Sequence, residues 1–189
     1  MKQNHLLYSA FITLLLPFGG AHATNLPSET ELKAEAITIV KQFGGTLKPK
    51  LQQGIKQGGF EHAIKVCAIE APKIAKELSN QTGWTVKRVS LKPRNSSAAP
   101  DEFERKVLES FNTQLAAGAS ISTLHYAETV GDEYRFMKPQ PVEAVCLGCH
   151  GKAISEGVKT LITEHYPEDT ATGYSLGEIR GAFSLVKKL

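Results

Sequence analysis

The sequence predicts an α+β protein in which helices come first and a small antiparallel sheet follows, with a helix and a cysteine-containing loop inserted. Two patterns predict this class. Apolar residues recur at helical spacing over most of the N-terminal half, whereas several short segments of the C-terminal half alternate apolar and polar residues. Stretches rich in Gly, Pro, Asn and Ser separate these segments, as turns and loops do.

Two helices are predicted in the N-terminal half. The first begins at Ser28, because Ser28 and Glu31 have the spacing of a capping box. Gly44-Gly45 is predicted to weaken this helix, and the helix is predicted to resume over 47–55 before a turn at Gly58-Gly59. The second helix is predicted over 60–78, interrupted or kinked at Pro72.

The C-terminal half supplies the sheet and two further helices. The predicted elements are a strand over 84–91, a loop over 92–100, a helix from Asp101 to about Ala117, a hairpin of 123–129 and 133–138 that turns at Gly131-Asp132, a short helix over 155–164, and a last strand over 180–187. In the first of these strands, Arg88 and Ser90 share one side with Val86, while Val89 lies on the other.

Residues 1–23 have the features of a secretory signal peptide. Lys2 precedes an apolar run over 6–18, and Ala21-His22-Ala23 offers a small-x-small cleavage site. The run is shorter than the roughly 20 residues that span a bilayer. We therefore expect cleavage before Thr24, export to the periplasm, and one domain over 24–189. No second apolar run of this length follows, so no membrane span is expected in the mature chain.

Charge excludes one class of partner. The signal peptide holds one lysine and no acid, so its removal lowers the net charge from +3 to +2. The positive and negative charges of this chain nearly balance, and it has no blocks of like charge. The sequence therefore gives no reason to expect binding to nucleic acid.

The cysteines carry the most specific chemistry. Cys146, Cys149 and His150 form a C-x-x-C-H segment, the spacing of c-type haem attachment. Two thiols at this spacing reach the two vinyl groups of one porphyrin, and the histidine that follows becomes the proximal ligand of the iron. The sequence thus predicts one covalent haem c. A zinc site would need a second ligand pair at similar spacing, and a thioredoxin-like pair would be expected early in the chain.

The other axial ligand has several candidates. Cys67 lies in the second predicted helix, and a thiolate is a soft ligand that suits iron, although a buried structural thiol is the alternative. Met137 is the rival, since His/Met ligation is frequent in electron carriers. The remaining candidates are His62, His125 and His165. Three basic residues near the predicted strand over 84–91 are candidates for binding the haem propionates: Arg88, Lys92 and Arg94.

Five separated segments of the chain resemble one known family in the same order. They are 66–67, 90–95, 99–104, 146–151 and 173–184. The family is the bacterial and cyanobacterial group of exported c-type haem domains with a PAS-like fold, long labelled a domain of unknown function. The resemblance implies a PAS-like antiparallel sheet with N-terminal helices and a haem loop late in the chain.

The resemblance also implies a ligand set. His150 matches the proximal ligand, Cys67 matches the distal thiolate, and Cys146 and Cys149 match the thioether cysteines. The chain departs from the family pattern at 135–139, where the family often has Tyr-Tyr-Lys-Pro, and this departure leaves Met137 as a competitor for the iron.

Three classes of function follow from a haem in such a protein. Electron transfer needs only an accessible haem edge, and redox or ligand sensing needs an iron that changes its ligand. A haem enzyme such as a peroxidase would need an open distal side and an acid–base pair there. A six-coordinate His/Cys iron argues against the enzyme, so we expect a non-enzymatic redox protein. Its partner would be a redox protein or a small diatomic ligand.

Overall fold

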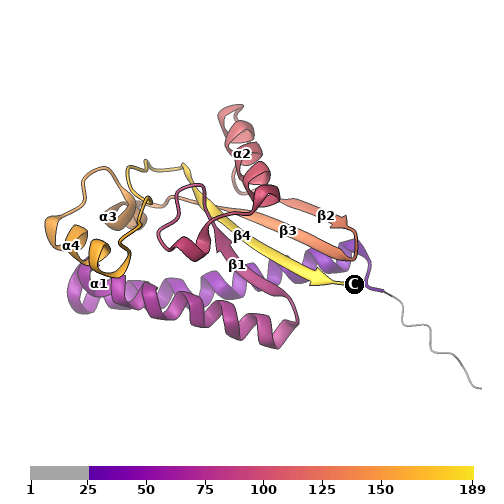
Figure 1. The fold of residues 1–189 in the computed structure, drawn as a ribbon, viewed down its shortest axis with the longest axis horizontal. Coiled ribbons are helices and arrows are strands. Elements are labelled where there is room, and N and C mark those ends of the chain that lie inside the picture. Colours follow the sequence, from indigo (N-terminus) through magenta and orange to yellow (C-terminus); the bar gives the residue numbers. More distant parts are fainter. Residues whose placement is uncertain (1–25) are drawn as a thin grey trace, which may run out of the picture.

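A four-stranded antiparallel sheet lies between a long helical hairpin and a single helix (Figure 1). The structure is a computed structural model and describes residues 26–189; the expected signal peptide and cleavage site lie outside these residues. The elements are α1 (Glu29–Thr82), β1 (Thr85–Val89), α2 (Glu102–Ala116), β2 (Tyr126–Val130), β3 (Glu133–Pro141), α3 (Leu147–His150), α4 (Glu156–His165) and β4 (Ile179–Lys188). Short 3-10 turns occupy Ser96–Ala98 and Ala144–Cys146.

The strands follow the order β1-β4-β3-β2, and every neighbouring pair is antiparallel. This arrangement confirms the predicted α+β class and is consistent with a PAS-like fold. The hairpin of β2 and β3 turns at Gly131-Asp132, as predicted. No helix within residues 26–189 is both long enough and apolar enough to cross a membrane.

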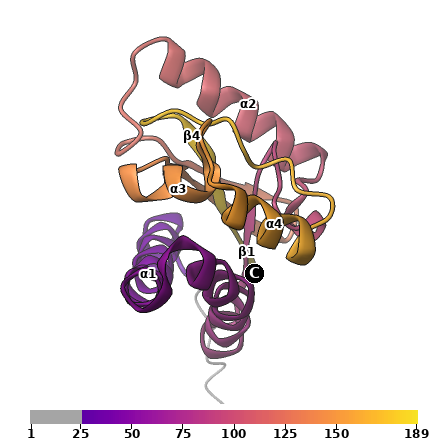
Figure 2. The same ribbon diagram turned by 90° about the vertical axis from the view of Figure 1, so that its left-hand side faces the viewer.

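Helix α1 is a hairpin of two arms. Its start carries the predicted capping box of Ser28 and Glu31, and its backbone leaves the helical range at Gly58 (φ −162°) and Gly59 (φ +68°). The two arms lie side by side along one face of the sheet (Figure 2). The positive φ of Gly59 is a conformation that side chains resist, which explains a glycine at this bend.

Two expected irregularities in α1 are absent. The helix passes through Gly44-Gly45, and the backbone around Pro72 stays helical up to Thr82. A glycine inside a helix costs about 1 kcal/mol relative to alanine. Burial of Phe43 and Ile39 against the sheet outweighs that cost, because each fully buried apolar side chain contributes about 1.5–3 kcal/mol.

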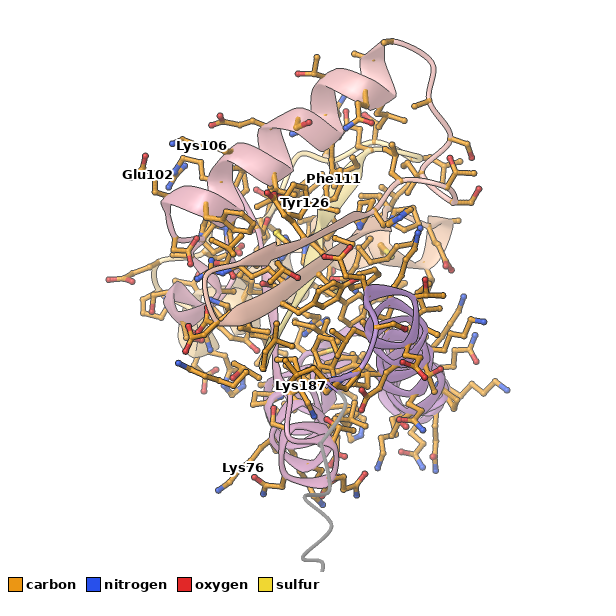
Figure 3. All side chains as sticks on the ribbon, turned by 90° about the vertical axis from the view of Figure 1, so that its right-hand side faces the viewer. Lys76, Glu102, Lys106, Phe111, Tyr126 and Lys187 are labelled. Carbon is orange, nitrogen blue, oxygen red and sulfur yellow. The ribbon has the colours of Figure 1, made fainter. Side chains whose placement is uncertain are left out.

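Both faces of the sheet are apolar, so each needs a cover. On β3, Phe136 packs in the cluster that holds both arms of α1, whereas its neighbour Met137 packs in the cluster that holds α2. Successive residues of a strand point to opposite faces. Figure 3 shows Phe111 of α2 turned toward the sheet, while Glu102 and Lys106 point away from it.

A buried carboxylate fixes α2 on the sheet. Glu104 closes the capping box of α2 with Asp101 and is almost fully buried. Its oxygen Oε1 accepts a hydrogen bond from Ser184 of β4 (2.7 Å) and pairs with Lys87 of β1 (2.8 Å). The other oxygen, Oε2, accepts from the backbone N–H of Asp101. A buried charge needs such partners in place of the water that it loses, and Glu104 has three of them.

Candidate functional site

The C-x-x-C-H segment lies at the end of the helical hairpin, where α1 bends. Cys146 ends a 3-10 turn, and Cys149 and His150 lie in α3. Gly148 faces the ring of Phe60 so closely that a Cβ atom there would overlap the ring. Figure 1 shows α3 and α4 together at this end of the molecule, beside α1.

The segment is held from its C-terminal side by the chain over 171–174. Tyr174 N donates to His150 O (2.9 Å), and Gly173 N donates to Gly151 O (3.0 Å). Gly151 and Tyr174 form an isolated parallel bridge. The histidine therefore has a fixed backbone and a half-buried side chain.

The ring of His150 is set up as a neutral ligand. Its Nδ1 lies 2.7 Å from Ala171 O, and a carbonyl can only accept, so Nδ1 carries the proton and Nε2 keeps a free lone pair. Arg180 Nε also lies 3.2 Å from Nδ1, but a protonated Nδ1 cannot accept a hydrogen bond from it. The contact with Ala171 O is shorter, so we assign the proton of the ring to Nδ1. Burial, together with the charges of Arg180 and Arg94, lowers the pKa of His150 to about 2.

Arg94 links three parts of the site. It donates to Cys149 O (2.6 Å), to Ala171 O (3.3 Å) and to the Asp169 carboxylate (3.1 Å from Nε). These contacts position the cysteine segment through Nε and Nη2 of Arg94, while its Nη1 makes no hydrogen bond within the described residues. Lys92 donates from its ammonium to Thr172 O and lies 4.7 Å from the centre of the Tyr174 ring. Binding of a haem propionate by either residue stays a prediction.

Arg88 differs from the other two predicted basic residues. Its guanidinium lies 5.2 Å from the centre of the Phe43 ring and makes no hydrogen bond or ion pair within the described residues. Burial lowers the pKa of Arg88, and the nearby Cys67 sulfur raises it. A desolvated guanidinium without a partner offers five donors to an anion.

Cys67 faces the interior from the second arm of α1. It belongs to an inward stripe at helical spacing: Phe60, Ile64, Cys67, Ala71, Ile74 and Leu78. Along this stripe, Ile64 packs with α4 and Ala71 packs with the sheet, so Cys67 lies between two apolar clusters. Burial raises the pKa of the Cys67 thiol, while the charges of Arg88 and Arg94 lower it.

The three thiols of the site are unpaired with one another. Cys67, Cys146 and Cys149 are all free. Burial raises the pKa of Cys149 to about 11. No group of three or more His, Cys, Asp or Glu side chains within residues 26–189 is arranged to hold a bare metal ion.

The other candidate axial ligands lie elsewhere. Met137 is fully buried in the apolar cluster between the sheet and α2, on the face away from α1. The three candidate histidines are exposed: His62, His125 and His165. Cys67 is half-buried, as are Cys149 and His150, and its charge acts on the Cys149 thiol, whose pKa it helps to raise.

Two residues of the site were not assigned a role from sequence. Arg180 was placed only in the last predicted strand, yet it donates to Ser90 Oγ (2.9 Å) and Lys92 O (3.1 Å) beside the ring of His150. The sequence indicates a role for Arg180 only through its position in the segment 173–184, one of the five segments that resemble the family. Tyr166, directly after α4, packs against the same buried cluster as Cys149, and no local pattern identifies it.

The fold and the site together define an α+β domain, consistent with a PAS-like fold, that holds a C-x-x-C-H segment against a helical hairpin. The chain belongs to the Tll0287-like family, whose profile matches residues 23–187. Among solved structures it is similar to the crystal structure of the cyanobacterial heme-protein Tll0287, with 26% sequence identity and a TM-score of 0.67. That alignment covers 84% of this chain and 95% of the other. No curated protein matches the chain.

Proposed function

We propose that the chain is an exported, monohaem c-type protein that works by a change in the redox state or the ligand of its iron. Cys146 and Cys149 attach the haem, His150 is the proximal ligand, and Cys67 is the ligand on the opposite side. The role is electron transfer or haem-based sensing in the periplasm. The observation that carries the proposal is the ring of His150, which presents a bare Nε2 directly after two free thiols.

The proximal side supports this assignment chemically. A histidine that binds iron needs a neutral ring, an unprotonated coordinating nitrogen and a partner that fixes the other nitrogen. His150 meets these conditions through burial, the bare Nε2 and the bond to Ala171 O. Arg94 holds the carbonyl of Cys149, so the two thiols and the ring keep one arrangement.

The opposite side supports Cys67. A lone half-buried thiol such as Cys67 is open to oxidation in an exported protein, and bonding to iron removes that reactivity. Arg88 supplies a positive charge near the sulfur, and its unused donors suit a propionate. When bound, the haem supplies a one-electron couple whose potential the two axial ligands set.

The first experiment tests covalent attachment. The purified periplasmic protein is extracted with acidified acetone, and the colour should stay with the polypeptide. Pyridine treatment should then give the spectrum of a c-type haem. The Cys146→Ala, Cys149→Ala double variant is the control and should release its haem. Transfer of the colour from the unaltered protein into the organic layer would contradict the proposal.

A second measurement separates the two roles. The haem-loaded protein is reduced with dithionite, and carbon monoxide is added. If the ferrous spectrum changes on adding the gas, the sulfur leaves on reduction, and sensing is favoured. An unchanged spectrum with rapid electron exchange favours an electron carrier.

A further inference from the structure

A cavity of about 320 Å³ lies on the face of the sheet that α2 covers, away from the helical hairpin. It is bounded by the C-terminal half of α2, the chain that follows β1, and the turn that precedes β4. Figure 2 shows the chain that leads into β4 passing between α2 and α3. Pockets for small ligands have volumes of about 300–1,000 Å³, so this cavity suits a compact molecule.

The lining changes from apolar to polar between the floor of the cavity and its mouth. Four apolar side chains line it: Leu91, Leu108, Leu115 and Ile179. Of these, Leu108 and Ile179 are buried and form the floor. The polar side chains of Lys92, Asn112 and Glu178 are exposed and lie at the mouth. A ligand that matches this lining has an apolar part and a polar head.

The three polar side chains have donors or acceptors that are unused within the described residues. The Lys92 ammonium uses one of its three N–H groups on Thr172 O. Glu178 Oε2 accepts from Ser175 N (3.0 Å), and no residue donates to its Oε1. The side-chain amide of Asn112 makes no hydrogen bond there. The mouth of the cavity therefore offers one cation, one carboxylate and one amide.

Neighbouring groups hold the two charges in place. The Lys92 ammonium lies 4.7 Å from the centre of the ring of Tyr174, which is buried in the lining. Glu178 is joined to Ser175 in both directions, because Glu178 N also donates to Ser175 O (3.3 Å). Groups that are fixed before binding lose little conformational entropy when a ligand arrives.

We propose that this cavity binds a small apolar α-amino acid, whose carboxylate pairs with Lys92 and whose ammonium pairs with Glu178. A ligand with a carboxylate alone would bring a like charge to Glu178, and a ligand with an amine alone would bring one to Lys92. A zwitterion meets both charges, and the amide of Asn112 can bond to either end. The apolar side chain of the ligand is buried against Leu108 and Ile179, which favours a residue of the size of leucine. Such binding needs no haem ligand, so the inference is independent of the proposed function.

The test uses three molecules of nearly the same shape. They are L-leucine, 4-methylpentanoate, which lacks the amine, and 3-methylbutylamine, which lacks the carboxylate. Each is titrated into the purified protein, and binding is measured by calorimetry. We expect L-leucine to bind about tenfold more tightly than either of the others, because each of them loses one charged hydrogen bond. The inference is overturned if L-leucine does not bind, or if 4-methylpentanoate binds as tightly as L-leucine.

A variant shows that the preference comes from the cavity. Glu178→Gln keeps an oxygen for Ser175 N but removes the charge. It should bind L-leucine about tenfold more weakly and 4-methylpentanoate more tightly than the unaltered protein does, a reversal that loss of folding does not produce. Glu109→Gln is the matched control, because Glu109 is an exposed carboxylate of α2 outside the lining. If Glu178→Gln and Glu109→Gln bind both molecules equally, Glu178 does not recognise the ammonium and the inference is wrong.

Discussion

Replacing Arg94 tests the unit that holds the candidate site together. Arg94→Met keeps much of the side-chain length but leaves the Asp169 carboxylate without its cation and Cys149 O without its donor. The side chains of Arg94 and Asp169 are only 12% and 6% exposed. Removing one partner of a buried ion pair costs about 3–5 kcal/mol, because the other charge stays buried and unpaired.

The assay is thermal and urea denaturation of the haem-loaded protein. For a domain of this size, 1 kcal/mol shifts Tm by roughly 2–4 °C, so we expect Tm to fall by roughly 10 °C. Arg135→Met is the matched control. Arg135 also pairs with a carboxylate, through Nε and Nη2 that both donate to Glu133 Oε2, but at a more exposed position, where such a pair contributes about 0–1 kcal/mol.

A further variant separates the pair from the rest of the contact. Arg94→Met combined with Asp169→Leu removes both charges, so part of the lost stability should return. If Arg94→Met lowers Tm no more than Arg135→Met does, the pair of Arg94 and Asp169 does not hold the cysteine segment in place.

Three other predictions follow from the site. Cys67→Ser should keep the covalent haem, raise the potential and abolish the thiolate charge-transfer band, whereas Met137→Leu should change none of these; the opposite result would make Met137 the ligand. Gly148→Ala should cost about 1–3 kcal/mol in urea denaturation through overlap with Phe60, and Phe60→Ala should remove that overlap in the double variant. Mass spectrometry of the haem-loaded periplasmic protein should find Thr24 at the mature N-terminus, and an intact residue 1 in a membrane fraction would contradict export.

The helices and strands could be predicted because short sequence patterns mark where each one begins and ends. Ser28 and Glu31 form the capping box, and the pair Gly58-Gly59 marks the bend of α1. The predicted breaks at Gly44-Gly45 and Pro72 were wrong for a tertiary reason, since packing of both arms on the sheet outweighs a weak helix propensity.

The two ends of the haem site differ in how far sequence could predict them. The C-x-x-C-H spacing is a covalent requirement and can be read directly. The inward position of Cys67 also had a signal, because it follows Phe60 and Ile64 and precedes Ala71 at helical spacing.

The surroundings of the site had no such signal. Arg94 pairs with Asp169, and this carboxylate comes from a loop 75 residues later in the chain. Tyr166 depends on the packing of α4 against α1, which no local pattern encodes.

The register of β3 explains why Cys67 is preferred to Met137 in the proposed ligand set. Phe136 and Tyr134 are buried on the α1 side of the sheet, so Met137 must point to the α2 side. A shift of one residue would bring Met137 to the α1 side, but it would also move both aromatic rings out of the cluster that packs against α1. Each ring buried there contributes about 1.5–3 kcal/mol. Ligation by Met137 would therefore require β3 to break its pairing with β4.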